Sequence, residues 1–230
     1  MFKHGCRWFA VAVALASVLA AGAQTGSQTR RTVTEKIEWT WEVAADKPDP
    51  ALPNVLLIGD SITRAYAPTV IAALSGKANV YFVATSASVG DFRLPHQIEE
   101  YFAMTRPISW AVVHFNNGMH GWGYTEDEYA RYFPEMLNAI RDGAPAAKLI
   151  WSTTTPVRVA QASGASLPRI EARNQIAAKI MAKENIPTDD QYGLMLSHQD
   201  LHSDDVHFKD EGSAIQGKQV AATVLKALGK

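Results

Sequence analysis

The sequence predicts an α/β fold in which helices cover both faces of a mostly parallel sheet. Four short apolar runs with few interruptions predict strands that are buried on both faces: Val55–Ile58, Val80–Ala84, Ala111–Phe115 and Leu149–Trp151. Segments with apolar residues at helical spacing lie between and after these runs. Strands that alternate with helices are typical of parallel sheets, because a parallel connection needs a crossover.

Residues 1–23 match a secretory signal peptide and not a part of the fold. Lys3 and Arg7 give a positively charged start, an apolar stretch covers residues 8–19, and Ala21-Gly22-Ala23 fits a cleavage site. The apolar stretch is shorter than the ~20 residues that a membrane-spanning helix needs. We therefore expect a secreted or periplasmic protein with no membrane partner after cleavage. An uncleaved N-terminal anchor is the alternative.

The composition fits one globular domain over residues 51–230. The chain has 230 residues, of which 47% are hydrophobic and 20% charged. Its formal net charge of -1 gives no reason to expect a nucleic-acid partner. The single cysteine, Cys6, lies in the leader, so the mature chain has no disulfide framework and no thiol nucleophile. Oligomeric state is not predicted.

Residues 24–50 are interpreted as a linker or an N-terminal extension, because they are polar and end in Pro48-Asp49-Pro50. Within them, Ile37, Trp39, Trp41 and Val43 alternate with polar residues. This period of two predicts a short, half-buried strand at a sheet edge.

The clearest predicted helix runs from a capping box at Thr125 and Glu128 through apolar residues up to Ile140, with Pro134 as a possible kink. Apolar spacing predicts two further helices, around residues 176–181 and 221–228. Residues 160–168 are rich in Ala, Ser and Gly, which predicts a flexible loop.

The first predicted strand leads into Gly59-Asp60-Ser61-Ile62. Ligands of parallel sheets bind beyond the carboxyl ends of the strands, so the hydroxyl of Ser61 is a candidate nucleophile. Its backbone N–H would be free at a helix N-terminus. The alternative is that Asp60 or Ser61 only caps the helix. Thr63 stands where the G-x-S-x-G elbow requires a second glycine, so that motif is absent.

His207 follows Asp204 by three residues, a spacing that lets the carboxylate accept a hydrogen bond from one ring nitrogen. The other nitrogen could then take a proton from Ser61. A solvated polar loop is the alternative. The acids and histidines between His198 and His207 also suggest a metal site, but their spacing matches no known ligand pattern.

The third predicted strand ends in Asn116-Asn117-Gly118, and an asparagine amide there could stabilise an oxyanion. An ordinary Asn-Gly turn is the alternative. Gly90 follows the second strand and could present another backbone N–H.

Together these blocks resemble the SGNH hydrolases, also called the GDSL esterase family. Gly59-Asp60-Ser61-Ile62-Thr63 matches the family's first block, and Asp204-x-x-His207 followed by Phe208 and Gly212 matches its last. The resemblance covers residue 52 to the C-terminus and implies a flavodoxin-like three-layer α/β/α fold without a cofactor. It implies Ser61 as nucleophile, His207 as base and Asp204 as its partner, with the oxyanion hole formed by the N–H groups of Ser61 and Gly90 and an asparagine side chain.

The middle blocks depart from the family pattern. The second reads Ser88-Val89-Gly90-Asp91, and the third lacks the usual glycine and aspartate. The string from His114 to His120 resembles a subgroup variant, H-F-N-x-G-(L/M)-H, which favours Asn116 as the oxyanion donor, with Asn117 as second choice. Trp122 and His120 follow this block and are predicted to bind substrate.

The sequence therefore predicts a secreted serine esterase that cleaves carboxylic esters through an acyl-enzyme. Its expected substrates are small-molecule or glycan esters with O-acetyl or other short acyl groups. Two alternatives remain: a non-catalytic glycan-binding module on the same fold, and a metal-dependent phosphoesterase that uses the cluster from His198 to His207.

Overall fold

The computed structural model describes Met1 and residues 30–230, and residues 31–230 form one unit around a six-stranded sheet. The strands are β1 (Thr40–Val43), β2 (Asn54–Gly59), β3 (Asn79–Thr85), β4 (Trp110–Phe115), β5 (Lys148–Ser152) and β6 (Thr188–Asp189). Their order is β1-β3-β2-β4-β5-β6, and only β1 runs antiparallel to its neighbour. Without β1, this is the strand order of flavodoxin-like folds.

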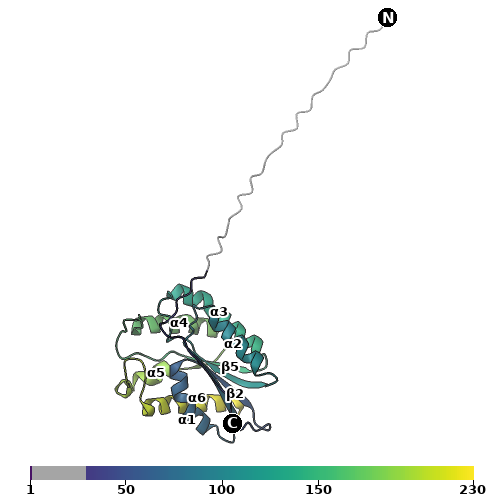
Figure 1. The fold of residues 1–230 in the computed structure, drawn as a ribbon, viewed down its shortest axis with the longest axis vertical. Coiled ribbons are helices and arrows are strands. Elements are labelled where there is room, and N and C mark those ends of the chain that lie inside the picture. Colours follow the sequence, from purple (N-terminus) through teal and green to yellow (C-terminus); the bar gives the residue numbers. More distant parts are fainter. Residues whose placement is uncertain (2–29) are drawn as a thin grey trace. The chain divides into compact units, whose positions relative to one another are not determined.

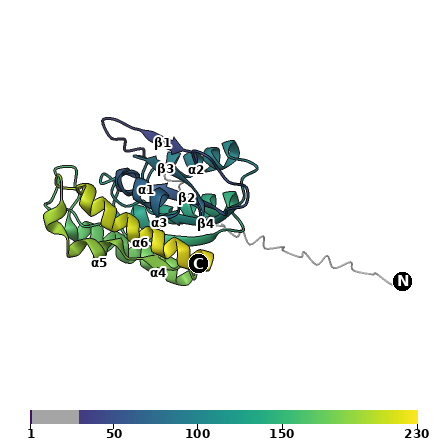
Figure 2. The ribbon, with the colours of Figure 1, turned by 90° about the horizontal axis from the view of Figure 1, so that it is seen from below.

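Two layers of helices enclose the sheet (Figures 1 and 2). The helices are α1 (Ser61–Ala73), α2 (Arg93–Met104), α3 (Glu126–Gly143), α4 (Leu167–Lys183), α5 (Gln191–Leu196), the 3₁₀ turn η1 (Gln199–Leu201) and α6 (Asp210–Leu228). Helices α1 and α6 pack together on one face, whereas α2, α3 and α4 cover the other. The predicted three-layer α/β/α fold is confirmed.

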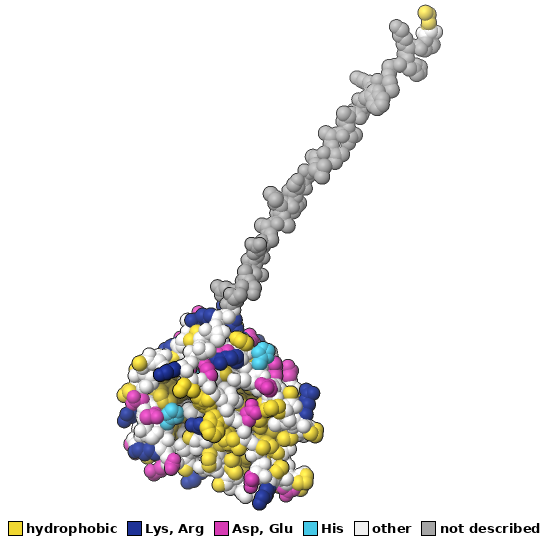
Figure 3. All heavy atoms as spheres, viewed as in Figure 1, with side chains coloured by type: hydrophobic (Ala, Val, Ile, Leu, Met, Phe, Trp, Pro, Cys, Tyr) yellow, Lys and Arg dark blue, Asp and Glu magenta, His cyan; other side chains and the backbone are white. Residues whose placement is uncertain are grey.

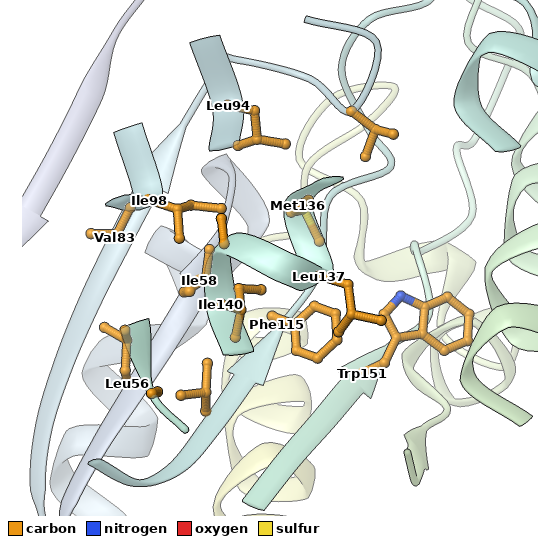
Figure 4. Close-up of a cluster of buried hydrophobic side chains, with 14 of the residues drawn as sticks. Leu56, Ile58, Val83, Leu94, Ile98, Phe115, Met136, Leu137, Ile140 and Trp151 are labelled. Carbon is orange, nitrogen blue, oxygen red and sulfur yellow. The ribbon is translucent and has the colours of Figure 1, made fainter. Parts of the chain in front are cut away.

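Alternate residues of the central strands fill two separate cores. On β2, Val55 and Leu57 pack against α1 and α6, while Leu56 and Ile58 pack against α2 and α3. Figure 4 shows the second core, where Leu137 of α3 lies beside Phe115 and Trp151 of neighbouring strands. Because both faces are covered, the central strands are largely apolar, which is the pattern that identified them in the sequence.

Most predicted elements are present, although α4 and α6 begin at Leu167 and Asp210, well before the predicted residues 176 and 221. The capping box of Thr125 and Glu128 opens α3, and the helix continues through Pro134 to Gly143. The predicted edge strand is β1, shortened to Thr40–Val43. The predicted loop ends at Ser166, since α4 begins at Leu167. The two-residue strand β6 was not predicted, because so short a strand has no periodicity.

The predicted signal peptide and the first part of the interpreted linker fall on residues outside those described. From Arg31 on, the chain packs against the sheet domain, as an N-terminal extension would. The domain boundaries themselves remain a prediction.

Among residues 30–230, no helix combines the length and apolar character needed to cross a bilayer. On the face shown in Figure 3, acidic and basic side chains are interspersed among hydrophobic ones. That face offers no continuous basic patch of the kind that binds nucleic acid.

Candidate active site

Three side chains that are far apart in the sequence form a hydrogen-bonded chain at the carboxyl end of the sheet. The Oγ atom of Ser61 lies 2.8 Å from Nε2 of His207, and Nδ1 of His207 lies 2.8 Å from a carboxylate oxygen of Asp204. The structure thus brings together all three residues of the predicted triad. A neutral His207 whose Nδ1–H donates to Asp204 leaves Nε2 free to accept the hydroxyl proton of Ser61.

The turn from β2 into α1 places Ser61. Asp60 caps the helix, because its carboxylate accepts a hydrogen bond from the N–H of Ile62 at 2.9 Å. A Cβ on Gly59 would lie 2.0 Å from Oγ1 of Thr63, so the turn is too tight for any other residue. Asp60 is therefore the cap, and Ser61 is left as the first helical residue with its hydroxyl directed to His207.

Ser61 also lies at the topological switch point of the sheet. Strand β2 is flanked by β3 and β4, whose crossovers run to opposite faces. Such a point leaves a crevice beyond the strand ends, which is where flavodoxin-like folds bind ligands.

Backbone hydrogen bonds hold the carboxylate of Asp204 in place beside the imidazole of His207. One of its carboxylate oxygens accepts from the backbone N–H groups of Val206 and His207, both at 2.7 Å, and the other faces His207. Partial burial alone would raise the pKa of Asp204, but these hydrogen bonds outweigh it and lower the pKa to about 2. The carboxylate is therefore ionised at any pH at which His207 can act as a base.

Ser61 and His207 open onto a cleft of about 550 Å³. Its other walls come from the N-terminal extension, from the loop after β4, and from the loops before α4 and α6: Val33, Thr34, Glu35, Lys36, Met119, His120, Gly121, Trp122, Gly123, Ser163, Ala165 and Val206. A larger hollow, about 890 Å³, lies at the other end of the sheet around the start of β5, away from the Ser61–His207 pair.

His120, predicted to bind substrate, lies in this cleft and forms a second imidazole–carboxylate pair. Its Nδ1 is 2.7 Å from the carboxylate of Glu35. Burial by itself lowers the pKa of His120, but the hydrogen bond with Glu35 and the negative charges of Asp60, Glu35 and Glu38 outweigh burial and raise it. The cleft that contains Ser61 therefore holds a histidine whose pKa lies above its ordinary value.

Trp122 also lines the cleft, although it is mostly buried. The guanidinium carbons of Arg173 and Arg169 lie 4.0 and 5.2 Å from the centroid of its ring. Arg173, itself buried, donates to the carbonyls of His120 and Gly121 at 2.9 Å and of Tyr124 at 3.1 Å. Burial lowers its pKa to about 10, which still leaves it charged at neutral pH. Arg173 thus fixes the loop that carries His120 and Trp122.

The two candidate oxyanion asparagines have different partners. The side-chain amide of Asn117 bridges the chain after β3, donating to the carbonyl of Ala87 at 2.9 Å and accepting from the N–H of Val89 at 3.0 Å. The amide nitrogen of Asn116 donates to the carbonyl of Ser152 and to the hydroxyl of Thr154. Neither asparagine lines the 550 Å³ cleft, so the oxyanion role of Asn116 stays a prediction.

Gly90 is held close to an aromatic ring. A Cβ at this position would lie 2.2 Å from Cγ of Tyr124. The hydroxyl of the same tyrosine accepts from the N–H of Val33 at 2.8 Å. Packing therefore requires a glycine here, and a role for its N–H in the oxyanion hole also stays a prediction.

The histidines and acids between His198 and His207 do not converge. Asp205 pairs with Arg158 at 2.7 Å, and the ring of His202 stacks on Phe208 with centroids 4.1 Å apart. Nowhere in the described part of the chain do three or more His, Cys, Asp or Glu residues gather in a way that could hold a metal ion.

Two functional features were missed in the sequence. The first is the extension: Val33, Glu35 and Lys36 were assigned to a linker or extension, yet they form a wall of the cleft. The second is Arg173, which the helical spacing of the sequence could have identified. It is three residues after Ile170 and four before Ala177, so it falls on the buried face of α4. A charged residue in such a position needs fixed partners.

No protein-family model matches this chain, and no curated protein sequence matches it either. Solved structures do share its fold. An acetyl xylan esterase is 18% identical, with a TM-score of 0.58 over 74% of this chain and 99% of its own. A carbohydrate esterase of family 3 from Talaromyces cellulolyticus is 17% identical, with a TM-score of 0.58 over 77% of this chain and 99% of its own. A GDSL-like lipase from Bacteroides thetaiotaomicron is 17% identical, with a TM-score of 0.56 over 76% of this chain and 88% of its own. At these identities the similarity establishes the fold.

Proposed function

We propose that this protein is a serine esterase of the SGNH kind that hydrolyses carboxylic esters carrying O-acetyl or other short acyl groups. The observation that carries the proposal is the continuous Ser61–His207–Asp204 chain, with both links at 2.8 Å, at the edge of an open cleft. Esterases among the solved structures of the same fold, including the acetyl xylan esterase, support it.

The reaction proceeds in two balanced halves. Nε2 of His207 takes the proton of Ser61 while Oγ attacks the ester carbonyl, and the oxyanion then collapses with loss of the alcohol, which receives that proton. Water next attacks the acyl-enzyme, His207 removes one of its protons, and Ser61 regains it as the acid leaves. Asp204 holds one ring orientation and stabilises the imidazolium in both halves.

The lining of the cleft mixes polar side chains with apolar ones such as Trp122 and Met119, which suits an alcohol that has both hydroxyl groups and an apolar face. The cleft is bordered by Lys36, Glu35 and His120, which are polar, and the fold-sharing carbohydrate esterases point to a glycan as that alcohol. No step requires a metal or cofactor.

The deciding experiment compares wild type with Ser61→Ala on p-nitrophenyl acetate and on acetylated xylan, together with labelling by a fluorophosphonate probe. We expect labelling only of wild type and a loss of at least about 10³-fold in kcat in the variant, with an unchanged circular dichroism spectrum.

Two results would favour the alternatives. A wild-type protein that binds glycans but neither labels nor turns over would be a binding module. Phosphoesterase activity that EDTA abolishes would identify a metal-dependent enzyme. Near wild-type esterase activity in Ser61→Ala would refute the nucleophile.

We also propose export, to the periplasm or the medium, with cleavage before Gln24. The supporting observation is the charged, apolar and Ala-x-Ala pattern of residues 1–23. N-terminal sequencing of exported material tests it, and an intact Met1 form in the cytoplasm alone would refute it.

A further inference from the structure

We propose that Trp39, Trp41 and Arg64 form an aromatic strip that binds the sugar residues next to the acylated one, which makes a glycan chain of several residues the preferred substrate. This inference rests on the proposed function for the identity of the cleft. It adds a binding surface outside the cleft, built from the N-terminal extension and α1.

The strip is a row of side chains on the sheet edge. Trp39 directly precedes β1 and Trp41 lies within it, so the two side chains project from one side of the strand, with Cα atoms about 7 Å apart. Trp41 is 49% exposed, although a tryptophan is normally more buried. The guanidinium carbon of Arg64 lies 4.8 Å from the ring centroid of Trp41 and 5.5 Å from that of Trp39.

The strip begins at the cleft. The ring of Trp39 meets that of His120 edge-on, with centroids 5.8 Å apart, and His120 lines the cleft with Ser61. Arg64 lies one helical turn after Ser61 on α1. Strand β1 is antiparallel to β3, with Thr40 opposite Thr85 and Val43 opposite Phe82. From Trp39 to Trp41 the strip therefore leads away from the site along the edge strand, which Figure 2 shows beside β3.

Arg64 supplies the polar part of the surface. Its side chain is exposed, and within the described residues its guanidinium makes cation–π contacts but no hydrogen bond or ion pair. The indole rings hold the guanidinium plane in place, so its N–H donors are oriented without being used. A sugar ring has an apolar face and hydroxyl groups at its rim. Such a ring can stack on Trp41 and accept hydrogen bonds from Arg64.

The shape favours a glycan over an acyl chain. An acyl chain is best bound in an enclosed apolar channel, whereas this strip is an open ridge on which the ring of Trp41 is 49% exposed. Aromatic faces flanked by hydrogen-bonding groups suit an amphipathic ligand that stays partly in water.

The test measures dependence on chain length. In the Ser61→Ala protein, which cannot turn over, we expect acetylated xylohexaose to bind about tenfold more tightly than acetylated xylose by calorimetry. Adding Trp41→Ala should remove most of this difference. Arg64→Ala tests the strip a second time, without altering β1. When either substitution is made in the protein that retains Ser61, the ratio of kcat/KM for acetylated xylohexaose to kcat/KM for acetylated xylose should also fall.

The matched control is Met104→Ala, which truncates a side chain that is 56% exposed at the far end of α2. It should preserve the length dependence. Equal affinities for the two sugars, or the same affinities in Trp41→Ala as in Met104→Ala, would overturn the proposal. So would a Trp41→Ala defect confined to long-chain p-nitrophenyl esters, which would assign the strip to the acyl group. Because binding is measured without turnover, it still reports on the strip if the protein has no esterase activity.

Discussion

Asp204 contacts His207 twice, once at its backbone N–H and once at its ring, with different carboxylate oxygens at 2.7 and 2.8 Å. The first contact closes the turn, and the second orients the imidazole toward Ser61. The same four-residue segment, Asp204–His207, thus both forms the turn and sets the tautomer of the imidazole. The three-residue spacing that suggested this contact in the sequence is the spacing that this turn requires.

We predict that Asp204→Asn lowers kcat by about 10³–10⁴-fold, because an amide can hold the imidazole in the wrong tautomer. The pKa of Asp204 is lowered to about 2, so its ionised form stabilises the folded state above about pH 4 and loses that effect as the pH falls toward 2. Urea denaturation of both proteins from pH 7 to pH 2.5 should show their stability difference shrinking in acid. A constant difference would contradict this linkage.

We predict that the two asparagines differ in what their loss changes: the stability of the fold for Asn117 and kcat for Asn116. Asn117→Ala leaves the buried N–H of Val89 and carbonyl of Ala87 without this partner, and should destabilise the fold by about 2 kcal/mol or more. If Asn116 is the oxyanion donor, Asn116→Ala should lower kcat by about 10²–10³-fold with little change in KM.

Both variants should be measured on one ester, with denaturation curves for each. Asn116→Asp is the control, because it keeps the shape and removes the N–H donor. A large kcat loss in Asn117→Ala, with normal stability and a nearly normal Asn116→Ala, would assign the role to Asn117.

We predict that Glu35→Gln lowers the pKa of His120, since the hydrogen bond and charge of Glu35 help to raise it against burial. A raised pKa stabilises the folded state at acidic pH, and the effect disappears as the pH rises through that pKa. Glu35→Gln should therefore cost stability at pH 5 and little at pH 9. Titration of the imidazole proton by NMR measures the shift directly.

The matched control is Glu99→Gln, which removes the partner of His96 in another histidine–glutamate pair, at 3.0 Å and exposed. It should leave His120 unchanged. An unaltered His120 titration in Glu35→Gln would show that the remaining acids alone raise its pKa.

We predict that Arg173→Lys destabilises the protein by about 3 kcal/mol, because an ammonium cannot replace the planar donor set that meets the carbonyls of His120, Gly121 and Tyr124. KM should rise as the loop loosens. Arg169→Lys, one turn earlier and more exposed, is the control and should cost less. Equal losses in the two variants would contradict a special role for Arg173.

Local patterns were enough to predict the α/β layers, whereas the triad was predicted from local spacing together with the resemblance of its two blocks to a family. Buried strands such as Val55–Ile58 are continuous apolar runs, and Asp204 and His207 lie within one turn. The contacts that shape the cleft join distant parts of the chain, as Glu35 does with His120. No local periodicity encodes such a contact. The polar residues around Glu35 therefore indicated only a linker or extension.

The wall formed by residues 33–36 precedes the first parallel strand and interrupts no crossover of the α/β unit. The hydrogen bonds of its residues go to Tyr124, Glu38 and His120 and not to the triad, so we expect insertions, deletions or exchanges in this segment to leave the connection between Ser61 and His207 intact. Evolution can therefore change what the protein recognises separately from how it reacts. Protein engineers can do the same by grafting the N-terminal segment of one such enzyme onto the sheet of another.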